Sequence, residues 1–445
     1  MVTAAAAGAA AAAAPFSTTM GLLAKDSKNA PAKKVQVPKK NNQIKAASSA
    51  KKPNPGERKA SRKRIQLSNN NALEVAGLGT LEAGTMTDPA NAGKMFAVPD
   101  HIQDRLRTLE AFKPTQAWSL FRRPHVLLRS EVVDLVSRLQ ASAADKKAQR
   151  LVLTGAKLSG KSIALLQAMT YGLLNDWVVI NIPEGQDLTN GNTEYSPIAD
   201  SGEPMQFAQP TYTLKLLTSI YNANREQLDK LRQEKDWTST TNQKQAGGTL
   251  SELILSAKEA DWAWPTFSAL WTELTLPGRP PVLLTLDGLS HISKVTEYRD
   301  PSFNRVHAHD LTLVGAFVDA LSGKTAMPNG GAVIAATSGN NAHRHPSQEL
   351  VLSQLEAGQA GREVPLPEPY KKGYDDRVYD SLKNSTVLRL DGVTKEDARA
   401  LMEYWGASGL LRARIDQRTV WEKWALGGHG LVGEMERASL LTVRV

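Results

Sequence analysis

Cysteine is absent from this chain of 445 residues, and so is any long apolar run. Without cysteine there can be no disulfide framework, no thiol chemistry and no cysteine-ligated zinc, which fits a reducing or redox-neutral compartment. A transmembrane helix would need about 20 consecutive apolar residues, so we expect no membrane insertion. Aromatic residues are only 6% of the chain, but hydrophobic residues overall reach 41%. These proportions predict a globular protein, and the length allows two or three domains.

Acidic residues are nearly absent from residues 1–64, which contain fourteen Lys or Arg but only Asp26 and Glu57. The net charge of this segment is +12, so the net charge of +9 for the whole chain leaves −3 for residues 65–445. Large apolar residues are also rare in it, and such a segment buries too little surface to offset the entropy lost on ordering. We therefore expect residues 1–64 to be a disordered, basic, low-complexity tail.

Two functions are compatible with the composition of this tail. Residues 1–25 contain Ala, Ser and Thr and no acid, as in a mitochondrial targeting segment. The first basic residue is Lys25, however, so the early arginines of such segments are missing. Residues 33–64 include KKPNPGERKASRKR and predict an arm that contacts RNA phosphates in a salt-sensitive way. A solvated linker without a partner is the alternative.

The most specific motif of the chain is GAKLSGKS at residues 155–162, which has the form G-x-x-x-x-G-K-[ST] of a phosphate-binding loop. It follows the apolar run 151–154 and precedes a helical pattern of apolar residues. Backbone N–H groups of such a loop, and the N-terminus of the helix after it, face phosphate oxygens. Lys161 is expected to reach the β- and γ-phosphates, and Ser162 to bind Mg²⁺. The residues that we predict to contact the nucleotide here are Gly155, Ala156, Lys157, Leu158, Ser159, Gly160, Lys161, Ser162 and Ile163.

A second motif, PPVLLTLDG at 280–288, predicts a buried strand that ends in Asp287. We expect the carboxyl end of this strand to lie beside the phosphate-binding loop, because ligands of open parallel sheets bind at the carboxyl ends of the strands. Asp287 would then contribute, with Ser162, to the magnesium site. The two motifs together predict a nucleotide and a metal ion in one site.

The residue after Asp287 argues against efficient hydrolysis. In hydrolytic proteins of this architecture that position is usually a glutamate, which polarises the attacking water, but here it is Gly288. Along the chain the next acids are Glu297 and Asp300. General acid–base catalysis contributes about 10²–10⁴-fold to a rate, so we assign no catalytic residue. We predict a protein that holds a nucleotide and is at most a slow GTPase.

A further buried strand is predicted within residues 330–341, GGAVIAATSGNN. Its carboxyl end is polar, and Ser338 is the residue that we predict to contact the nucleotide there, near a γ-phosphate or its water. Thr337 and Asn340 are alternatives, and capping of the loop by these side chains is an equally good explanation.

Segment 121–143, FRRPHVLLRSEVVDLVSRLQASA, predicts an amphipathic helix just before the first strand of the sheet. Arg122, Arg123 and Arg129 in this segment can approach a nucleotide or a partner, but charged side chains are mostly exposed. We therefore expect these three arginines to be solvated at the surface.

The alternation of strands and helices predicts an α/β fold with a parallel sheet, and the phosphate-binding loop makes it a P-loop NTPase. The predicted strand 386–390 and the helix after it resemble the start of the small helical lid in AAA-type and STAND-type ATPases. In this fold a parallel sheet with flanking helices is followed by a small C-terminal helical lid. We expect an extended N-terminal arm at residues 65–120, the nucleotide-binding domain at 121–390 and the helical domain at 391–445. The helical domain would begin at Thr394, which forms a capping box with Asp397.

Residues from about 121 to 405 resemble the mitochondrial small-subunit ribosomal proteins of the death-associated GTP-binding family, in its fungal form. The similar segments, in the order of the family, are RRPHVLLRSEVVDLVSRL, GAKLSGKS, DWVVINIPEGQDL, LSELI, PVLLTLDGLSHI, MPNGGAVIAATS and LDGVTKEDARALMEYW. The resemblance implies a structural constituent of the mitochondrial small ribosomal subunit in the matrix, in contact with mitochondrial ribosomal proteins and small-subunit rRNA. It also implies a bound GTP or GDP with Mg²⁺, and a protein that is neither inserted in a membrane nor a homo-oligomer.

Two points stay open at this stage. The chain has no N-K-x-D element, which is the guanine-recognition motif of Ras-type and translational GTPases, so ATP remains possible in place of GTP. An AAA-type remodelling ATPase is the main alternative function, and a STAND-like signalling switch is a second one. The first would require a catalytic acid and an arginine from a neighbouring subunit, and the second a recognisable sensor or repeat domain.

Overall fold

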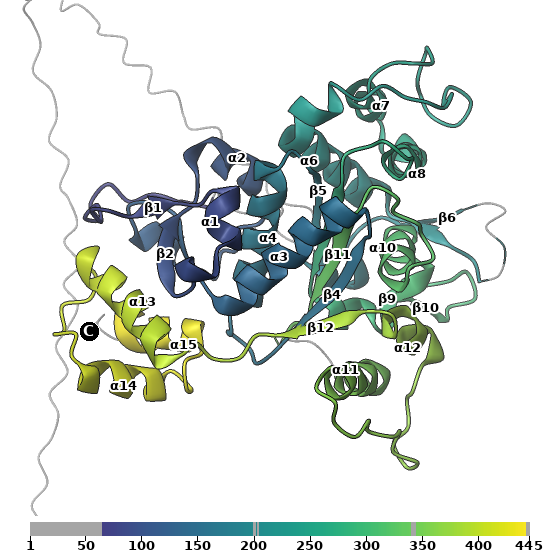
Figure 1. Cartoon of the computed structure of the whole chain (residues 1–445). Helices are drawn as coiled ribbons and strands as arrows, with labels where there is room; N and C mark the ends of the chain where they lie inside the picture. The colour runs from purple at the N-terminus through teal and green to yellow at the C-terminus, as the bar shows by residue number, and fades with distance from the viewer. Residues whose placement is uncertain (1–64, 199–201, 203, 340–343, 442–445) are drawn as a thin grey trace, which may run out of the picture. The chain divides into compact units, whose positions relative to one another are not determined.

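The computed structural model describes residues 65–198, 202, 204–339 and 344–441, which surround a five-stranded parallel sheet (Figure 1). The strand order is β12, β4, β11, β8, β5. The strands are β4 (Gln149–Thr154), β5 (Val178–Ile182), β8 (Val282–Asp287), β11 (Gly331–Ala336) and β12 (Thr386–Arg389). This order places β11 between the strand that leads into the phosphate-binding loop and the strand that ends in Asp287. The predicted tail, 1–64, and Asn340 lie outside the described residues.

Both faces of the sheet are covered by helices, which explains why its strands are continuous apolar runs. Successive residues of a strand point to opposite faces, and so Leu151 and Leu153 of β4 belong to one buried cluster while Val152 belongs to the other. On the first face lie α3 (Ser130–Asp145) and α4 (Lys161–Leu174). The second face is covered by α6 (Pro210–Leu228), α8 (Ala263–Leu274) and α10 (Thr312–Ser322). The predicted fold class, a parallel sheet with flanking helices, is confirmed.

The structure corrects the extended arm that we expected at residues 65–120. This segment is folded: β1 (Gly79–Thr80) and β2 (Lys94–Ala97) join β3 (His125–Leu128) in a three-stranded sheet. Two helices accompany them, α1 (Ala83–Thr87) and α2 (Asp100–Thr108). Leu81, Met86 and Ile102 are buried in the same cluster as α3 and α4. Most of these elements are too short to show a periodic pattern, and the predicted boundary at residue 121 separates two paired strands.

The C-terminal residues form the expected small helical domain, with α13 (Lys395–Ala407), α14 (Gln417–Leu426), α15 (Val432–Glu436) and a π-helical segment, Arg437–Leu441. The Thr394 side chain accepts a hydrogen bond from the Asp397 backbone N–H at the start of α13, which is one of the two hydrogen bonds of the predicted capping box. The domain packs on the segment before α3, where the His125 ring lies 4.1 Å from the Tyr404 ring between centroids. Residues from the two ends of the described chain therefore meet.

The remaining elements are shorter or lie at the periphery of the sheet. They are α5 (Gly185–Thr189), β6 (Ser196–Pro197), β7 (Phe207–Ala208), α7 (Leu250–Ser256), α9 (Leu289–Ile292), β9 (Val295–Arg299), β10 (Arg305–His307), α11 (Pro346–Gln359) and α12 (Asp376–Leu382). Among the described residues, no helix has the length and apolar character that crossing a membrane requires.

Candidate functional site: a cavity at the carboxyl end of the sheet

A cavity of about 550 Å³ opens at the carboxyl edge of the central sheet, within the size range of small-molecule sites. The parallel register pairs Ala336 of β11 with both Leu153 of β4 and Asp287 of β8, so the segments after these strands begin at the same level. The cavity brings together most of the residues that we predicted to contact the nucleotide: Lys157, Leu158, Ser159, Gly160, Lys161, Ser162, Ile163, Asp287 and Ser338.

The two other predicted residues, Gly155 and Ala156, form the base of the loop. Gly155 has a φ of +132°, and a Cβ built on it would lie 2.1 Å from the carbonyl oxygen of Leu390. Only glycine fits there, because the loop passes directly beside the chain that leaves β12. The curled conformation is therefore dictated both by the local backbone and by a neighbour distant in sequence.

Lys161 is held inside this loop. Its Nζ donates hydrogen bonds to the carbonyl oxygens of Gly155 and Ala156, at 2.9 and 2.7 Å. Burial lowers the pKa of the Lys161 ammonium, and the negative charge of Asp287 opposes this shift. The Ser159 hydroxyl, on the same loop, is buried and has no hydrogen-bond partner among the described residues. The loop thus contains a buried ammonium held by its own carbonyl groups and a buried hydroxyl without a partner.

Ser162 and Asp287, the two predicted metal ligands, are in direct contact. The Ser162 Oγ donates a hydrogen bond of 2.7 Å to Oδ2 of Asp287. Hydroxyl and carboxylate oxygens are ligands that suit Mg²⁺, which usually keeps waters and phosphate oxygens in the rest of its shell. Within the described part of the chain, no three His, Cys, Asp or Glu side chains gather into a metal site.

A lysine that the sequence did not single out reaches the same carboxylate. The Nζ of Lys113 lies 3.4 Å from Oδ2 of Asp287 and also donates to the carbonyl oxygen of Pro183. Both side chains of this ion pair are largely buried. Lys113 belongs to the segment that we expected to be an extended arm, and it adds a fixed positive charge beside the magnesium side of the cavity.

Arg129 is a second correction, because it is buried rather than solvated. Its Nη1 donates to the carbonyl oxygen of Ser159 in the loop, and its Nη2 donates to that of Asp391, both at 2.8 Å. Arg129 therefore braces the loop and connects it to the start of the helical domain. The other two arginines were also expected at the surface. Arg123 is exposed, and Arg122 is partly exposed and donates hydrogen bonds to the exposed Asn70.

The surroundings of Asp287 differ from those that the sequence indicated. Gly288 has a φ of +92° and its N–H donates to the carbonyl of Ala336 at 3.0 Å, so a glycine suits the turn after β8. Glu297 and Asp300 are not among the residues that line the cavity, whereas Glu184, which follows the neighbouring strand β5, is.

Polar groups after β11 complete this side of the cavity. The N–H and the hydroxyl of Thr337 both donate to the carbonyl oxygen of Leu153, at 3.0 and 3.1 Å. Thr337 is thus used to join the end of β11 to β4, which corresponds to the capping explanation. Ser338 lines the cavity, so its predicted contact with a nucleotide remains a prediction.

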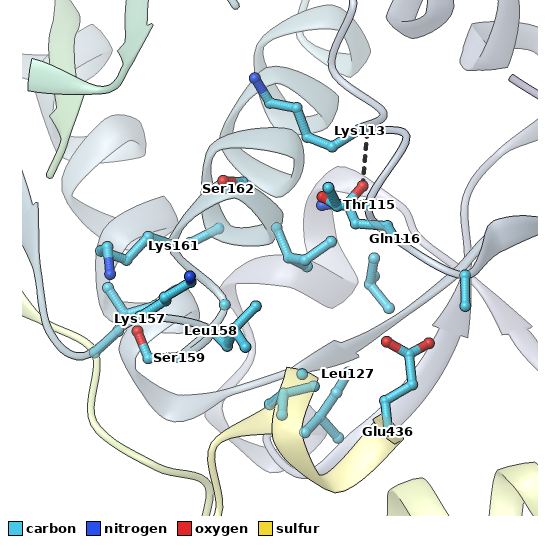
Figure 2. A pocket seen from close by; sticks show the side chains of 18 of the residues that line it. Lys113, Thr115, Gln116, Leu127, Lys157, Leu158, Ser159, Lys161, Ser162 and Glu436 are labelled. Atoms are coloured by element: carbon cyan, nitrogen blue, oxygen red, sulfur yellow. Dashed lines mark hydrogen bonds between the residues drawn. The ribbon is translucent and has the colours of Figure 1, made fainter. Parts of the chain in front are cut away.

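The other side of the cavity lies away from the phosphate-binding loop and includes Gln116, Leu127 and Glu436 (Figure 2). Gln116 comes from the segment before η2 (Trp118–Leu120), and Glu436 is the last residue of α15. Burial raises the pKa of the Glu436 carboxyl to about 7, although the neighbouring Arg437 opposes this shift. The sequence indicated neither residue, because no local motif surrounds them and only tertiary packing brings them to the cavity.

Comparisons with known proteins agree over most of the chain. Residues 126–438 match the family model described as mitochondrial ribosomal death-associated protein 3. The small ribosomal subunit protein mS29 of Neurospora crassa is 52% identical over 410 residues, which is 91% of this chain and 87% of that protein. The protein of the same name from Schizosaccharomyces pombe is 27% identical over 355 residues, 78% of this chain and 71% of that protein. Among solved structures, a Walker-type ATPase of Pyrococcus abyssi covers 74% of this chain and 70% of its own, at 12% identity and a TM-score of only 0.34.

Proposed function

The chain belongs to the mitochondrial ribosomal death-associated protein 3 family, and we propose that it holds a guanine nucleotide with Mg²⁺ within the mitochondrial small ribosomal subunit. As a member of this family it is a mitochondrial ribosomal protein, a structural constituent of the small subunit in contact with ribosomal proteins and rRNA. The nucleotide would occupy the cavity at the carboxyl end of the sheet and would stabilise the fold, with slow hydrolysis or none.

The arrangement of Lys161, Ser162 and Asp287 carries this proposal. The ammonium lies within the curled loop, and the Ser162 hydroxyl in the first turn of α4 already contacts the Asp287 carboxylate at the end of β8. The unpartnered hydroxyl of Ser159 is a further buried group that a phosphate oxygen would satisfy, and buried polar groups are nearly always hydrogen-bonded. Each of these groups has a use when a nucleotide phosphate is present.

The same residues fit Mg²⁺. Ser162 and Asp287 would hold the ion, directly or through water, and the ion would neutralise charge on the β- and γ-phosphates. Lys113 would share the charge of Asp287 with that ion, since its Nζ lies 3.4 Å from the carboxylate. Arg129 would keep the loop in its curled form through the carbonyl of Ser159.

Slow hydrolysis is proposed because Gly288 supplies no carboxylate to polarise a water molecule. Glu184 is the one acid of the cavity wall that follows a neighbouring strand, so it is the residue to test. We expect GTP and ATP turnover by the purified protein to stay near background, and Glu184→Gln to leave it there. Brisk turnover that Glu184→Gln abolishes would instead support the AAA-type ATPase, because loss of a general base costs about 10²–10⁴-fold.

The decisive experiment is sedimentation of a mitochondrial lysate through a gradient, followed by detection of this chain and analysis of the nucleotide that it carries. We expect it to migrate with the small ribosomal subunit and to carry one guanine nucleotide per chain. Migration as a separate ring-sized oligomer with adenine nucleotide would contradict the proposal and favour a remodelling ATPase. If the chain migrates with the subunit but carries no nucleotide, the ribosomal role stands and the proposed nucleotide binding is wrong.

We also propose that the basic tail contacts RNA and that residues 1–25 act in mitochondrial targeting. Residues 33–64 lie outside the described residues, so this part rests on their charge alone. Deletion of 33–64 should weaken RNA binding more at low salt than at high salt, because release of counterions drives contacts with phosphates. Equal loss at both salt concentrations, measured by filter binding, would contradict an electrostatic arm.

A further inference from the structure

The cavity has two chemically different sides. Around the phosphate-binding loop it presents Lys161, Ser159 and backbone N–H groups, which suit anions. The side away from the loop includes the polar residues Thr115, Gln116 and Glu436 and the apolar Leu127 (Figure 2), and the polar side chains of His125, Gln167 and Arg437 also line the cavity. A nucleotide with its phosphates in the loop would direct its base toward a region whose polar groups include the Gln116 amide and the Glu436 carboxylate.

The amide of Gln116 has a fixed orientation. Its Oε1 accepts hydrogen bonds from the backbone N–H of Lys113 at 2.9 Å and from the indole N–H of Trp118 at 2.6 Å. Both partners are donors only, so the oxygen must face them and the NH₂ group is left to face the cavity. The Nε2 has no hydrogen bond to any other described residue. Gln116 therefore offers a hydrogen-bond donor to a bound ligand.

The carboxylate of Glu436 offers the complementary acceptors. It has no hydrogen bond or ion pair within the described part of the chain, since Arg437 pairs instead with Glu434, at 3.1 Å between Nη1 and Oε1. Burial raises the pKa of Glu436 to about 7, as expected for a carboxylate that lacks donors. The helix that carries it is attached to the loop, because the N–H of Gly433 donates to the carbonyl of Leu158 at 3.2 Å.

We propose that Glu436 and Gln116 read the hydrogen-bonding edge of guanine and so give this pocket its base specificity. This inference rests on the proposed function, because the base reaches these residues only when phosphates occupy the loop. The two carboxylate oxygens would accept from N1–H and from the 2-amino group of guanine, and the Gln116 amide would donate to O6. Leu127, Leu158 and Val432, which line the cavity, would contact the faces of the ring.

Adenine fits this pair poorly. It presents an amino donor at position 6, opposite the Gln116 NH₂ group, and an unprotonated N1 acceptor, opposite the carboxylate. A site that places donor against donor and acceptor against acceptor discriminates strongly, because its polar groups stay buried and unpaired. The pair thus supplies the selection that the missing N-K-x-D element supplies in other GTPases.

The first test needs no variant. Dissociation constants of the purified full-length protein for GDP, IDP and ADP are measured with Mg²⁺ by competition against a fluorescent guanine nucleotide. IDP lacks only the 2-amino group, and we expect it to bind about tenfold more weakly than GDP, with ADP weaker by about 100-fold or more, the loss expected when one or two charge-assisted hydrogen bonds are missing. Equal binding of GDP and IDP would overturn the role of the carboxylate.

The second test is Glu436→Gln, with Glu434→Gln on the same helix as the matched control. Glutamine presents one acceptor and one donor, which suits the 2-oxo group and N1–H of xanthine. We therefore expect Glu436→Gln to lose about 100-fold in GDP affinity and to bind XDP at least tenfold more tightly than the unmodified protein does. Glu434→Gln should bind GDP, IDP and ADP in the same order of affinity as the unmodified protein. A gain for XDP is a result that a merely destabilised protein would not show.

The outcomes separate this inference from the proposed function. If guanine is still preferred in Glu436→Gln and XDP gains nothing, base reading by Glu436 is wrong while the nucleotide site stands. If the unmodified protein binds ADP as well as GDP, the inference is wrong for the same reason. If it binds none of the nucleotides, the proposed function fails, and the base-reading role fails with it.

Discussion

The two sides of the nucleotide cavity are encoded in different ways. The phosphate side, as proposed, comes mainly from the consecutive residues 155–162, whose glycines and helix start would form an anion site locally. The opposite side is lined by residues from two distant segments: Gln116 precedes the central sheet in the sequence, and Glu436 belongs to the last described helices. A phosphate is the same group in every nucleotide, so a local loop suffices to bind it. A base must be distinguished by its edge, which requires groups from separate elements held at fixed positions.

This difference predicts that substitutions on the phosphate side abolish binding of every nucleotide, and that Lys161→Ala has the largest effect of all. The variant should lose most of its bound nucleotide, and its melting temperature should fall because a ligand that binds only the folded state stabilises it by about 4 kcal/mol at 1,000 times its Kd. Nucleotide extracted from the purified protein is quantified by chromatography.

The matched control is Lys383→Ala, an exposed lysine that pairs with Asp380 on the surface. It should retain full nucleotide content. An unchanged content in Lys161→Ala would show that the loop does not hold the phosphates.

Arg129→Met tests whether the phosphate side depends on tertiary contacts as well. Removal of this buried guanidinium leaves the carbonyls of Ser159 and Asp391 without their donor, and we expect a loss of about 3 kcal/mol in the free energy of unfolding. Arg123→Met, at an exposed position, should change it by less than about 0.5 kcal/mol. Denaturant titration measures both, and similar small changes in the two variants would contradict the bracing role.

Unlike the two substitutions above, Glu436→Gln should stabilise the folded protein when no nucleotide is bound. The folded-state pKa of about 7 is above the ordinary value of 4.5, so ionisation destabilises the folded protein as the pH rises from about 4.5 and the cost is complete above about 7. The neutral glutamine removes that cost. We expect the variant to be more stable than the unmodified protein by about 2 kcal/mol at pH 8 and equal to it at pH 4.

The measurement is nucleotide-free unfolding at both pH values, with Glu434→Gln as the control on the same helix. With GDP added at pH 8, the unmodified protein should become the more stable of the two, because it binds GDP more tightly than Glu436→Gln does. A Glu436→Gln protein that is less stable at every pH would indicate a structural role for the carboxylate.

The smallest effect is expected for Lys113→Met, which removes the cation beside Asp287. Because the Lys113 ammonium competes with Mg²⁺ for the charge of this carboxylate, the variant should need several-fold less Mg²⁺ for half-maximal nucleotide binding. Titration of Mg²⁺ at constant GDP tests this, with Lys383→Ala again unchanged. A higher Mg²⁺ requirement would mean that Lys113 helps to place the ion rather than competing with it.

Several features of the fold follow from short-range patterns. The apolar runs at β4, β5, β8 and β11 indicated buried parallel strands, and the threonine at 394 indicated the start of α13. In contrast, residues 65–120 were misjudged because β1 is two residues long and α1 five. Such elements have no detectable period and exist because Leu81 and Met86 are buried against α3 and α4.

The candidate site shows the same division. The GAKLSGKS motif and the aspartate after β8 are apparent in the sequence, whereas the burial of Arg129 and the arrival of Glu184 at the cavity depend on which strands are neighbours. Distance along the sequence was a poor guide to the acids of the cavity. The next acid in the sequence after Asp287 is Glu297, but β5 is the neighbour of β8 in the sheet, so Glu184, which follows β5, lines the cavity instead.

By itself, the sequence determined the family, the GAKLSGKS motif, the buried strand that ends in Asp287 and the location of the excess positive charge, because each depends on neighbouring residues or on composition. Only the tertiary structure decided what surrounds the other side of the cavity. Gln116 and Glu436 reach that side only through tertiary packing, which also brings Lys113 to Asp287 and Arg129 to the loop. Contacts between distant segments leave no periodic or local pattern in a single sequence.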